Sequence, residues 1–206
     1  ACSREIWVRC INPRDPTRNE LDLEQRFPTP MRSDVLARSR EVGLDPAFIY
    51  GLIRQESRFI VEARSSVGAS GLMQVMPSTA QWTAKRIGMD YRPDMLAERD
   101  TNLRLGAAYL KLVLDDLSGS QPMAAAAYNA GPNRPRRWRD GPVLEPEVWI
   151  ENIPIHETRD YVKKVLSNAA YYGGQISVKP VALRPRLGSP IGPRDAAATA
   201  VNTDLP

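Results

Sequence analysis

The sequence predicts a mainly α-helical protein. Apolar residues recur at helical spacing in several segments, and N-capping residues or prolines precede these segments. Runs with the alternation of β-strands are scarce, and only residues 68–76 are candidates for short extended pieces. Hydrophobic residues make up 42% and charged residues 25% of the 206 positions, and this balance is typical of a soluble globular protein.

Start and stop signals define the expected helices. Ser33, Asp45 and Asp100 can act as N-caps, and Pro46 and Pro77 suit the first helical turn. Glycines follow most of these segments, as expected where helices end. The predicted helices span residues 33–43, 45–56, 77–88, 100–119, 122–129 and 157–172.

The two ends of the chain differ in composition from this helical part. Residues 1–32 are rich in Arg, Pro, Asp and Asn, and we interpret them as a lead-in or as the remnant of a preceding module. Residues 33–172 are expected to form the domain itself. Residues 173–206 are rich in Pro, Ala and Arg, so we expect an irregular or loosely docked tail, and deletion of residues 183–206 should leave activity intact.

Composition also limits the partners and cofactors. The net charge of +4 suits an anionic polymer such as nucleic acid, anionic lipid or cell wall, without choosing among them. No apolar run approaches the length of a membrane span, and no signal peptide is visible at Ala1, so we interpret the chain as a mature protein or a fragment. Cys2 and Cys10 could pair in an oxidising compartment. Together with His156 they are too few for a common structural zinc site, and no metal is expected.

Glu56 is the most informative residue for function. One further step along the apolar stripe of its helix leads to Glu56, so a carboxylate is expected on the core-facing side. Burial and the C-terminal end of the helix both disfavour the charged form, which predicts a raised pKa and a neutral acid near neutral pH. The alternative is a buried ion pair with Arg54 or Arg58. The stripe consists of Ile49, Leu52 and Ile53.

Residues 65–77 indicate a loop that contacts a ligand. Gly68 and Gly71 permit a tight turn and a close approach of the backbone to a ligand. A phosphate loop is disfavoured because no Lys-Ser or Lys-Thr pair follows and no strong strand precedes. Gln74 offers an amide and Met76 an apolar contact, and these groups suit the amides and ring faces of N-acetylated sugars.

Four motifs follow one another between residues 30 and 172. They are QESRF at 55–59, the glycine-containing segment 68–77, AYNAGP at 127–132 and IPIHETRDYV at 153–162. In this order they resemble the family-1 soluble lytic transglycosylases. The resemblance implies a lysozyme-like (goose-type) catalytic domain that acts on peptidoglycan in the periplasm, without a metal or an organic cofactor.

The resemblance also implies roles for single residues. Glu56 is expected to be the only catalytic residue, acting as general acid and base. Substrate binding is expected from Gln74, Met76, Tyr128, Asn129, Glu157 and Tyr161. The two tyrosines are expected near Glu56, although without the motifs they would be better explained as core aromatics with satisfied hydroxyls. His156 stands where serine is common in relatives and receives no role.

The implied reaction needs one carboxylate. Glu56 protonates the glycosidic oxygen that leaves C1 of N-acetylmuramic acid, and the 2-acetamido group stabilises the developing charge. The carboxylate then accepts the proton of the C6 hydroxyl, which attacks C1 and closes a 1,6-anhydro ring. The expected partner is the peptidoglycan glycan strand, with no nucleic acid and no integral membrane segment. Endo and exo action are not separated by the sequence.

Three other functions stay open at this point. A muramidase of the same fold would use water and leave a reducing end. A non-catalytic glycan-binding module would have no need of the acid. A nucleic-acid-binding helical domain is suggested by a basic aromatic run, which equally suits wall peptide carboxylates or a solvated face. That run is Arg134, Arg136, Arg137, Trp138 and Arg139.

Overall fold

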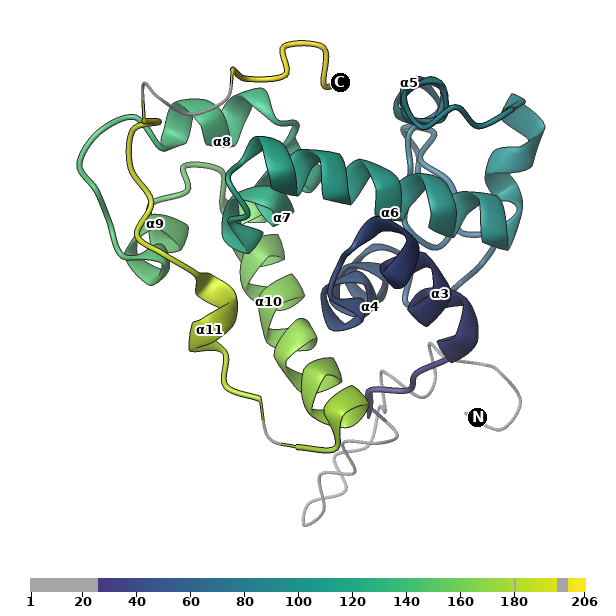
Figure 1. Cartoon of the computed structure of the whole chain (residues 1–206), viewed down its shortest axis with the longest axis horizontal. Coiled ribbons are helices and arrows are strands. Elements are labelled where there is room, and N and C mark those ends of the chain that lie inside the picture. The colour runs from purple at the N-terminus through teal and green to yellow at the C-terminus, as the bar shows by residue number, and fades with distance from the viewer. Residues whose placement is uncertain (1–25, 180, 196–199) are drawn as a thin grey trace.

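The computed structural model describes residues 26–179, 181–195 and 200–206, and helices dominate it as predicted (Figure 1). The elements are α3 (Arg32–Val42), α4 (Pro46–Glu56), α5 (Pro77–Arg86), the 3-10 helix η2 (Pro93–Ala97), α6 (Arg99–Asp116), α7 (Gln121–Ala130), α8 (Asn133–Trp138), α9 (Pro146–Glu151), α10 (His156–Ser177) and α11 (Arg184–Leu187). Within these ranges β pairing is limited to isolated bridges, two of which join residues 64, 70 and 75. Cys2 and Cys10 lie outside the described residues. No helix in the described ranges is both long and apolar enough to cross a bilayer.

Helices α4 and α10 pack closely against each other at the centre of the fold (Figure 1). Every residue of α4 from Ala47 to Ile53 is buried. At Gly51 the backbones meet, because an added Cβ would lie 2.6 Å from the carbonyl oxygen of Val165 and 2.9 Å from the amide nitrogen of Ala169. The absence of a side chain at Gly51 therefore sets the distance between the two helices. It also sets the position of the α10 side chains relative to the C-terminal end of α4.

Gly51→Ala is expected to destabilise the fold by about 2–4 kcal/mol, because the methyl group would overlap the α10 backbone. Gly174→Ala is the matched control, since it is also a helical glycine but an added Cβ there would meet its nearest atom at 3.5 Å. That change should be neutral or stabilising by up to about 1 kcal/mol. Urea unfolding of both variants measures the difference. Equal midpoints would show that α4 and α10 can separate at little cost.

Most of the predicted helix signals are confirmed. The carboxylate of Asp45 accepts a hydrogen bond from the amide of Ala47 at 2.9 Å, as an N-cap does. The N-cap predictions for Ser33 and Asp100 are each wrong by two residues, because the N-caps are Met31 and Glu98 and both candidate caps lie inside the first turn. Short elements η2, α8, α9 and α11 were not predicted, since a turn or two is too short for periodicity to be visible.

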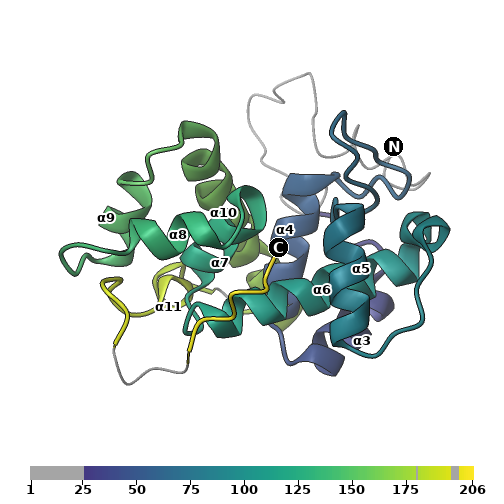
Figure 2. The same cartoon turned by 90° about the horizontal axis from the view of Figure 1, so that it is seen from above.

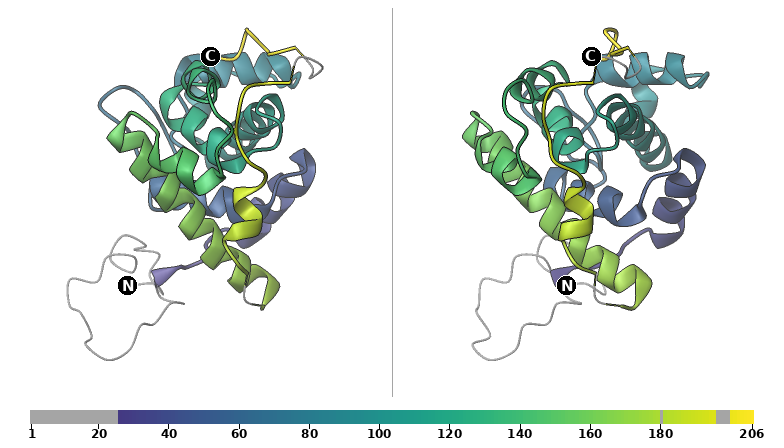
Figure 3. Two further views of the ribbon diagram at one scale, coloured as in Figure 1. Left: turned by 90° about the vertical axis from the view of Figure 1, so that its left-hand side faces the viewer. Right: turned by 60° about the vertical axis from the view of Figure 1, so that its left-hand side comes forward.

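Beyond α10, the described part of the tail is irregular apart from α11 (Arg184–Leu187), as predicted, but it is not loosely docked. Helix α10 continues past residue 172 to Ser177, and the segment after it contributes Leu187, Ile191 and Leu205 to the hydrophobic core, each at most 5% exposed. Residues 188–195 run over the outside of the helices after α11, and residues 200–206 end near α6 (Figures 2 and 3). Two arginines of the basic run hold it: Arg139 donates to the carbonyl of Gly192 and Arg136 to that of Asn202. These two guanidinium groups thus have structural contacts, which weakens the nucleic-acid interpretation of the run.

Candidate active site

Glu56 ends α4 on the face that the apolar stripe predicts. Ile49, Leu52 and Ile53 are fully buried, and Glu56 is half-buried next to them. Burial raises the pKa of the Glu56 carboxyl from its ordinary value of 4.5 to about 7, and a hydrogen bond from Tyr161 offsets part of this rise. The side chain can therefore hold a proton near neutral pH, as expected from the sequence.

Two tyrosines from other helices converge on this carboxyl. Tyr161 of α10 donates its hydroxyl to Glu56 Oε1 at 2.5 Å. Tyr128 of α7 donates to the carbonyl oxygen of Met73 at 2.9 Å. Burial and then the charge of Glu56 raise the pKa of both tyrosines well above the ordinary value, so both hydroxyls remain protonated donors.

The structure does not show the alternative ion pair between Glu56 and an arginine. The Arg54 guanidinium lies 4.0 Å from the ring centroid of Phe27 and donates to the carbonyl of Arg26. Arg58 is exposed. None of the ion pairs in the described part of the chain includes Glu56. Among the described residues, therefore, no cation pairs with this carboxyl and lowers its pKa.

Asn102 of α6 holds the loop between α4 and α5, and the sequence analysis missed this residue. Its fully buried amide nitrogen donates to the carbonyls of Ser70 at 2.8 Å and Leu96 at 3.1 Å, and its oxygen accepts from the amide of Met73 at 2.9 Å. Gly71 has φ +78, and a Cβ there would lie 2.2 Å from the Asn102 amide nitrogen. The one local signal for Asn102 is a polar side chain in the first turn of a helix whose buried residues are mostly apolar.

Gln74 supports the same loop. Its amide nitrogen donates to the carbonyls of Ala63 at 3.1 Å and Gly71 at 2.8 Å, so this end of the side chain is already engaged. Gln74 also borders a cavity of about 230 Å³. The cavity is lined by Gln74, Val75, Met76, Thr79, Tyr109, Ala127, Tyr128, Asn129, Gly131 and Pro206. Both apolar and polar residues line it, which suits a sugar ring with an N-acetyl group.

The remaining candidate residues differ in placement. Asn129 lines the cavity and its side-chain oxygen accepts a hydrogen bond from Thr158 at 2.7 Å, which joins α7 to α10. Glu157 is exposed in the first turn of α10 and does not border the cavity. Tyr161 reaches Glu56 instead of the cavity. The structure therefore gathers one group of predicted residues at the cavity and leaves Glu157 apart. That group is Gln74, Met76, Tyr128 and Asn129.

Tyr161→Phe is expected to raise the pKa of Glu56 by about 1 unit, because it removes a hydrogen bond that favours the carboxylate. A carboxyl-carbon NMR titration of Glu56 measures this shift directly. Tyr171→Phe on the same helix is the control, since this residue is 49% exposed and keeps its ring stacked on Phe27 after the change. A Glu56 pKa that is the same in both variants would contradict the prediction.

Comparison with known proteins agrees with this geometry. The family model described as the transglycosylase SLT domain matches residues 35–142, more than half of the chain. The chain belongs to the SLT transglycosylase family. A second model, described as the soluble lytic transglycosylase helical domain, matches residues 152–180 of the SLT chain, a range that contains all of α10.

Named relatives cover most of this SLT chain. It is 40% identical over 154 residues to the soluble lytic murein transglycosylase of Salmonella typhimurium, a match that covers 73% of the chain and 24% of the relative. The Escherichia coli protein of the same name is 36% identical over 162 residues. That match covers 77% of the chain and 25% of the relative. The chain spans about a quarter of the length of these relatives.

Solved structures confirm the mainly helical, lysozyme-like fold. The lytic transglycosylase Slt of Pseudomonas aeruginosa, in an inactive form with one glutamate replaced by glutamine, superposes with a TM-score of 0.80 at 40% identity. This match covers 88% of the SLT chain and 30% of the other. A complex of the 70-kDa soluble lytic transglycosylase with bulgecin A superposes with a TM-score of 0.73 at 33% identity. This match covers 84% of the SLT chain and 28% of the other chain.

Proposed function

We propose that this SLT chain is a peptidoglycan lytic transglycosylase that cleaves the β-1,4 bond between N-acetylmuramic acid and N-acetylglucosamine. The observation that carries the proposal is the half-buried Glu56, whose pKa is raised to about 7 and whose carboxyl is held by Tyr161. A carboxyl with such a pKa can both donate and accept a proton near neutral pH, and the proposed reaction asks one group to do both.

The first step is the protonation of the leaving oxygen. Glu56 gives its proton to the glycosidic oxygen while positive charge develops at C1 of N-acetylmuramic acid, and the substrate's 2-acetamido oxygen stabilises that charge. The carboxylate formed in this step keeps the hydrogen bond from Tyr161, which limits the cost of its charge. Tyr161 thus holds the carboxylate between the two steps.

The second step forms the anhydro ring. The Glu56 carboxylate accepts the proton of the C6 hydroxyl, whose oxygen bonds to C1 and regenerates the acid. Because the nucleophile belongs to the substrate, the step needs no second carboxylate to activate water. In agreement with this, the pKa of Glu56 is set by burial and Tyr161, and no acidic neighbour among the described residues contributes to it.

Substrate contacts are assigned to the residues at the cavity and beside it. Met76 offers an apolar surface to the sugar, and Asn129 and Tyr128 border the same cavity. Gln74 offers its side-chain oxygen to the sugar, while its amide nitrogen holds the loop. Glu157 is exposed, and we assign it to a glycan subsite beyond the cavity. The proposed partner is the glycan strand of peptidoglycan, and the proposed location is the bacterial periplasm, because the matched relatives are murein transglycosylases.

Mass spectrometry of the soluble products from purified peptidoglycan tests this function. Muropeptides that end in 1,6-anhydro-N-acetylmuramic acid, one water lighter than hydrolytic products, are expected. Reducing ends would instead identify a muramidase of the same fold. No products, together with retained glycan binding, would identify a non-catalytic binding module.

A further inference from the structure

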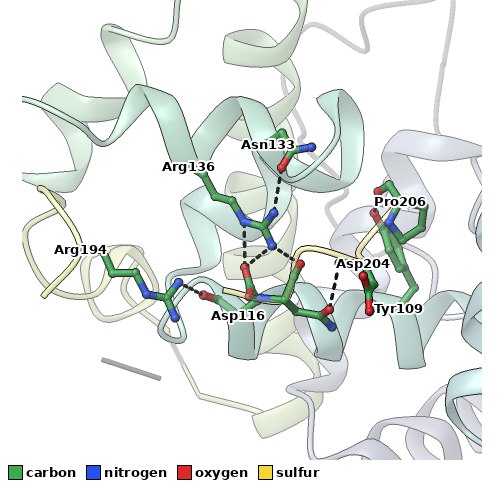
Figure 4. Close-up of polar contacts among 8 residues, drawn as sticks. Tyr109, Asp116, Asn133, Arg136, Arg194, Asp204 and Pro206 are labelled. Atoms are coloured by element: carbon green, nitrogen blue, oxygen red, sulfur yellow. Dashed lines mark hydrogen bonds and ion pairs between the residues drawn. The ribbon is translucent and has the colours of Figure 1, made fainter. Parts of the chain in front are cut away.

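The end of the described chain lies beside the candidate sugar cavity. Residues 200–206, here called the strap, finish at Pro206, which borders the cavity together with Gln74, Met76 and Tyr128. The hydroxyl of Tyr109 donates to the carbonyl oxygen of Pro206 at 3.0 Å (Figure 4). No residue of the strap was among the predicted site residues, so the cavity contains a wall that local sequence patterns did not indicate.

A buried ion pair anchors the strap. Arg136 donates through Nε at 3.1 Å and Nη2 at 2.7 Å to Oδ2 of Asp116, whose side chain is 4% exposed (Figure 4). The other carboxylate oxygen accepts the amide of Asn202 at 2.7 Å, and Arg136 also donates to the Asn202 carbonyl at 2.8 Å. A charge pair enclosed in this way tolerates little displacement, because any movement leaves a buried charge without its partner.

Two further contacts fix the strap between this anchor and its end. The amide of Leu205 donates to the Asn202 carbonyl at 3.3 Å, and the amide of Asp204 donates to the Asn202 side chain at 3.2 Å, so the backbone forms a turn. Leu205 is 4% exposed and belongs to the hydrophobic core. The strap is therefore held like the rest of the fold and differs from a mobile lid.

The last residue of the strap is connected to the reaction centre by two aromatic rings. Tyr109, which holds the Pro206 carbonyl, packs its ring against Tyr128 with centroids 5.6 Å apart. Tyr128 in turn responds to the charge of Glu56. Pro206 and Tyr128 therefore border the same cavity, and Pro206 is exposed there.

We propose that the strap is a fixed wall of the sugar-binding site, and that Pro206 contacts the apolar face of a bound N-acetylhexosamine ring. This inference rests on the proposed function and adds a specificity-determining segment to it. The pyrrolidine ring and the side chains of Val75, Met76 and Ala127 give the cavity its apolar surface, while Gln74, Thr79 and Asn129 give it polar atoms. It reverses the expectation that residues 183–206 can be removed without effect on activity.

Binding of a β-1,4-linked N-acetylglucosamine tetramer, measured by titration calorimetry, tests the wall without requiring turnover. All chains carry Glu56→Gln, so that no cleavage disturbs the measurement. Pro206→Gly removes the ring and should weaken binding about fivefold, the effect expected for the loss of one apolar contact surface. A chain that stops after Ala200 should bind the tetramer at least as weakly as the Pro206→Gly variant does. Thr203→Ala, an exposed strap residue that does not border the cavity, is the control and should bind unchanged.

The outcomes separate the wall from the function on which it rests. If the full chain binds the tetramer and Pro206→Gly binds equally well, the strap is not part of the site. Tighter binding after removal of the strap would also overturn the proposal, because it would show that the segment covers the groove. If the shortened chain fails to fold, the affinity of the Pro206→Gly variant for the tetramer still tests the proposal. If the full chain binds no glycan at all, the proposed function itself fails.

Discussion

Replacing Glu56 by glutamine is expected to abolish glycan cleavage while making the folded protein more stable at alkaline pH. Glutamine keeps the size of the side chain and can still accept the hydrogen bond from Tyr161, but it cannot donate or accept the reacting proton. The rate should fall by about 10²- to 10⁴-fold, the range for a positioned acid and base. Release of anhydro-muropeptides at pH 6 measures the loss. For the unsubstituted chain, activity should decline above about pH 7, where Glu56 loses its proton.

The stability gain follows from the direction of the pKa shift. In the unfolded chain Glu56 ionises near 4.5, whereas in the folded chain it keeps its proton up to about pH 7. The unfolded state therefore releases a proton that the folded state retains, and the free energy of unfolding falls as pH rises from 4.5 to 7. Above pH 7 the full penalty of about 3–4 kcal/mol is present, and Glu56→Gln should recover about 1–2 kcal/mol of it. Below pH 4.5 the two proteins should be equally stable in this respect.

Urea unfolding at pH 4, 6 and 8 measures this difference, with Glu62→Gln as the matched control. Glu62 is exposed, and its replacement should change neither the rate nor the pH dependence of stability. Glu56→Gln protein that retains more than a tenth of the activity would exclude Glu56 as the acid. An unfolding free energy that is unaffected by the substitution at pH 8 would show that the carboxyl ionises freely in the folded state.

Asn102→Ala is expected to cost about 3–5 kcal/mol of stability and most of the activity. The substitution removes three hydrogen bonds and leaves the carbonyls of Ser70 and Leu96 and the amide of Met73 buried without these partners. Met73 also presents the carbonyl to which Tyr128 donates. A loop that shifts at this point therefore displaces the tyrosine beside Glu56, even though Asn102 does not border the cavity.

Asn152→Ala provides the comparison for Asn102→Ala. Asn152 is an exposed asparagine at the end of α9, and surface substitutions of this kind usually change stability by less than about 0.5 kcal/mol. Unfolding midpoints and initial rates should be taken at a temperature at which both variants are folded. Folded Asn102→Ala protein with unchanged activity would show that the loop keeps its shape through its remaining bonds, including those of Gln74.

The sequence alone determined the features of this protein that depend on local order. Asp45, Pro46 and the stripe before Glu56 fix a helix that carries a carboxylate on its buried face, because side-chain direction in a helix follows from spacing alone. The raised pKa of Glu56 follows from the same pattern, since burial is its largest cause. Short motifs with an unusual residue order were enough to identify the family.

Tertiary structure decided what depends on residues far apart along the chain. Glu56 and Tyr161 are separated by 105 positions, and Tyr109 and Pro206 by 97. Periodicity describes which face of a helix is buried, but it does not say which other segment covers that face. The support of the loop by Asn102, the exposure of Glu157 and the anchoring of the strap by Asp116 and Arg136 arise only when helices pack, because each depends on the approach of side chains that no local pattern brings together.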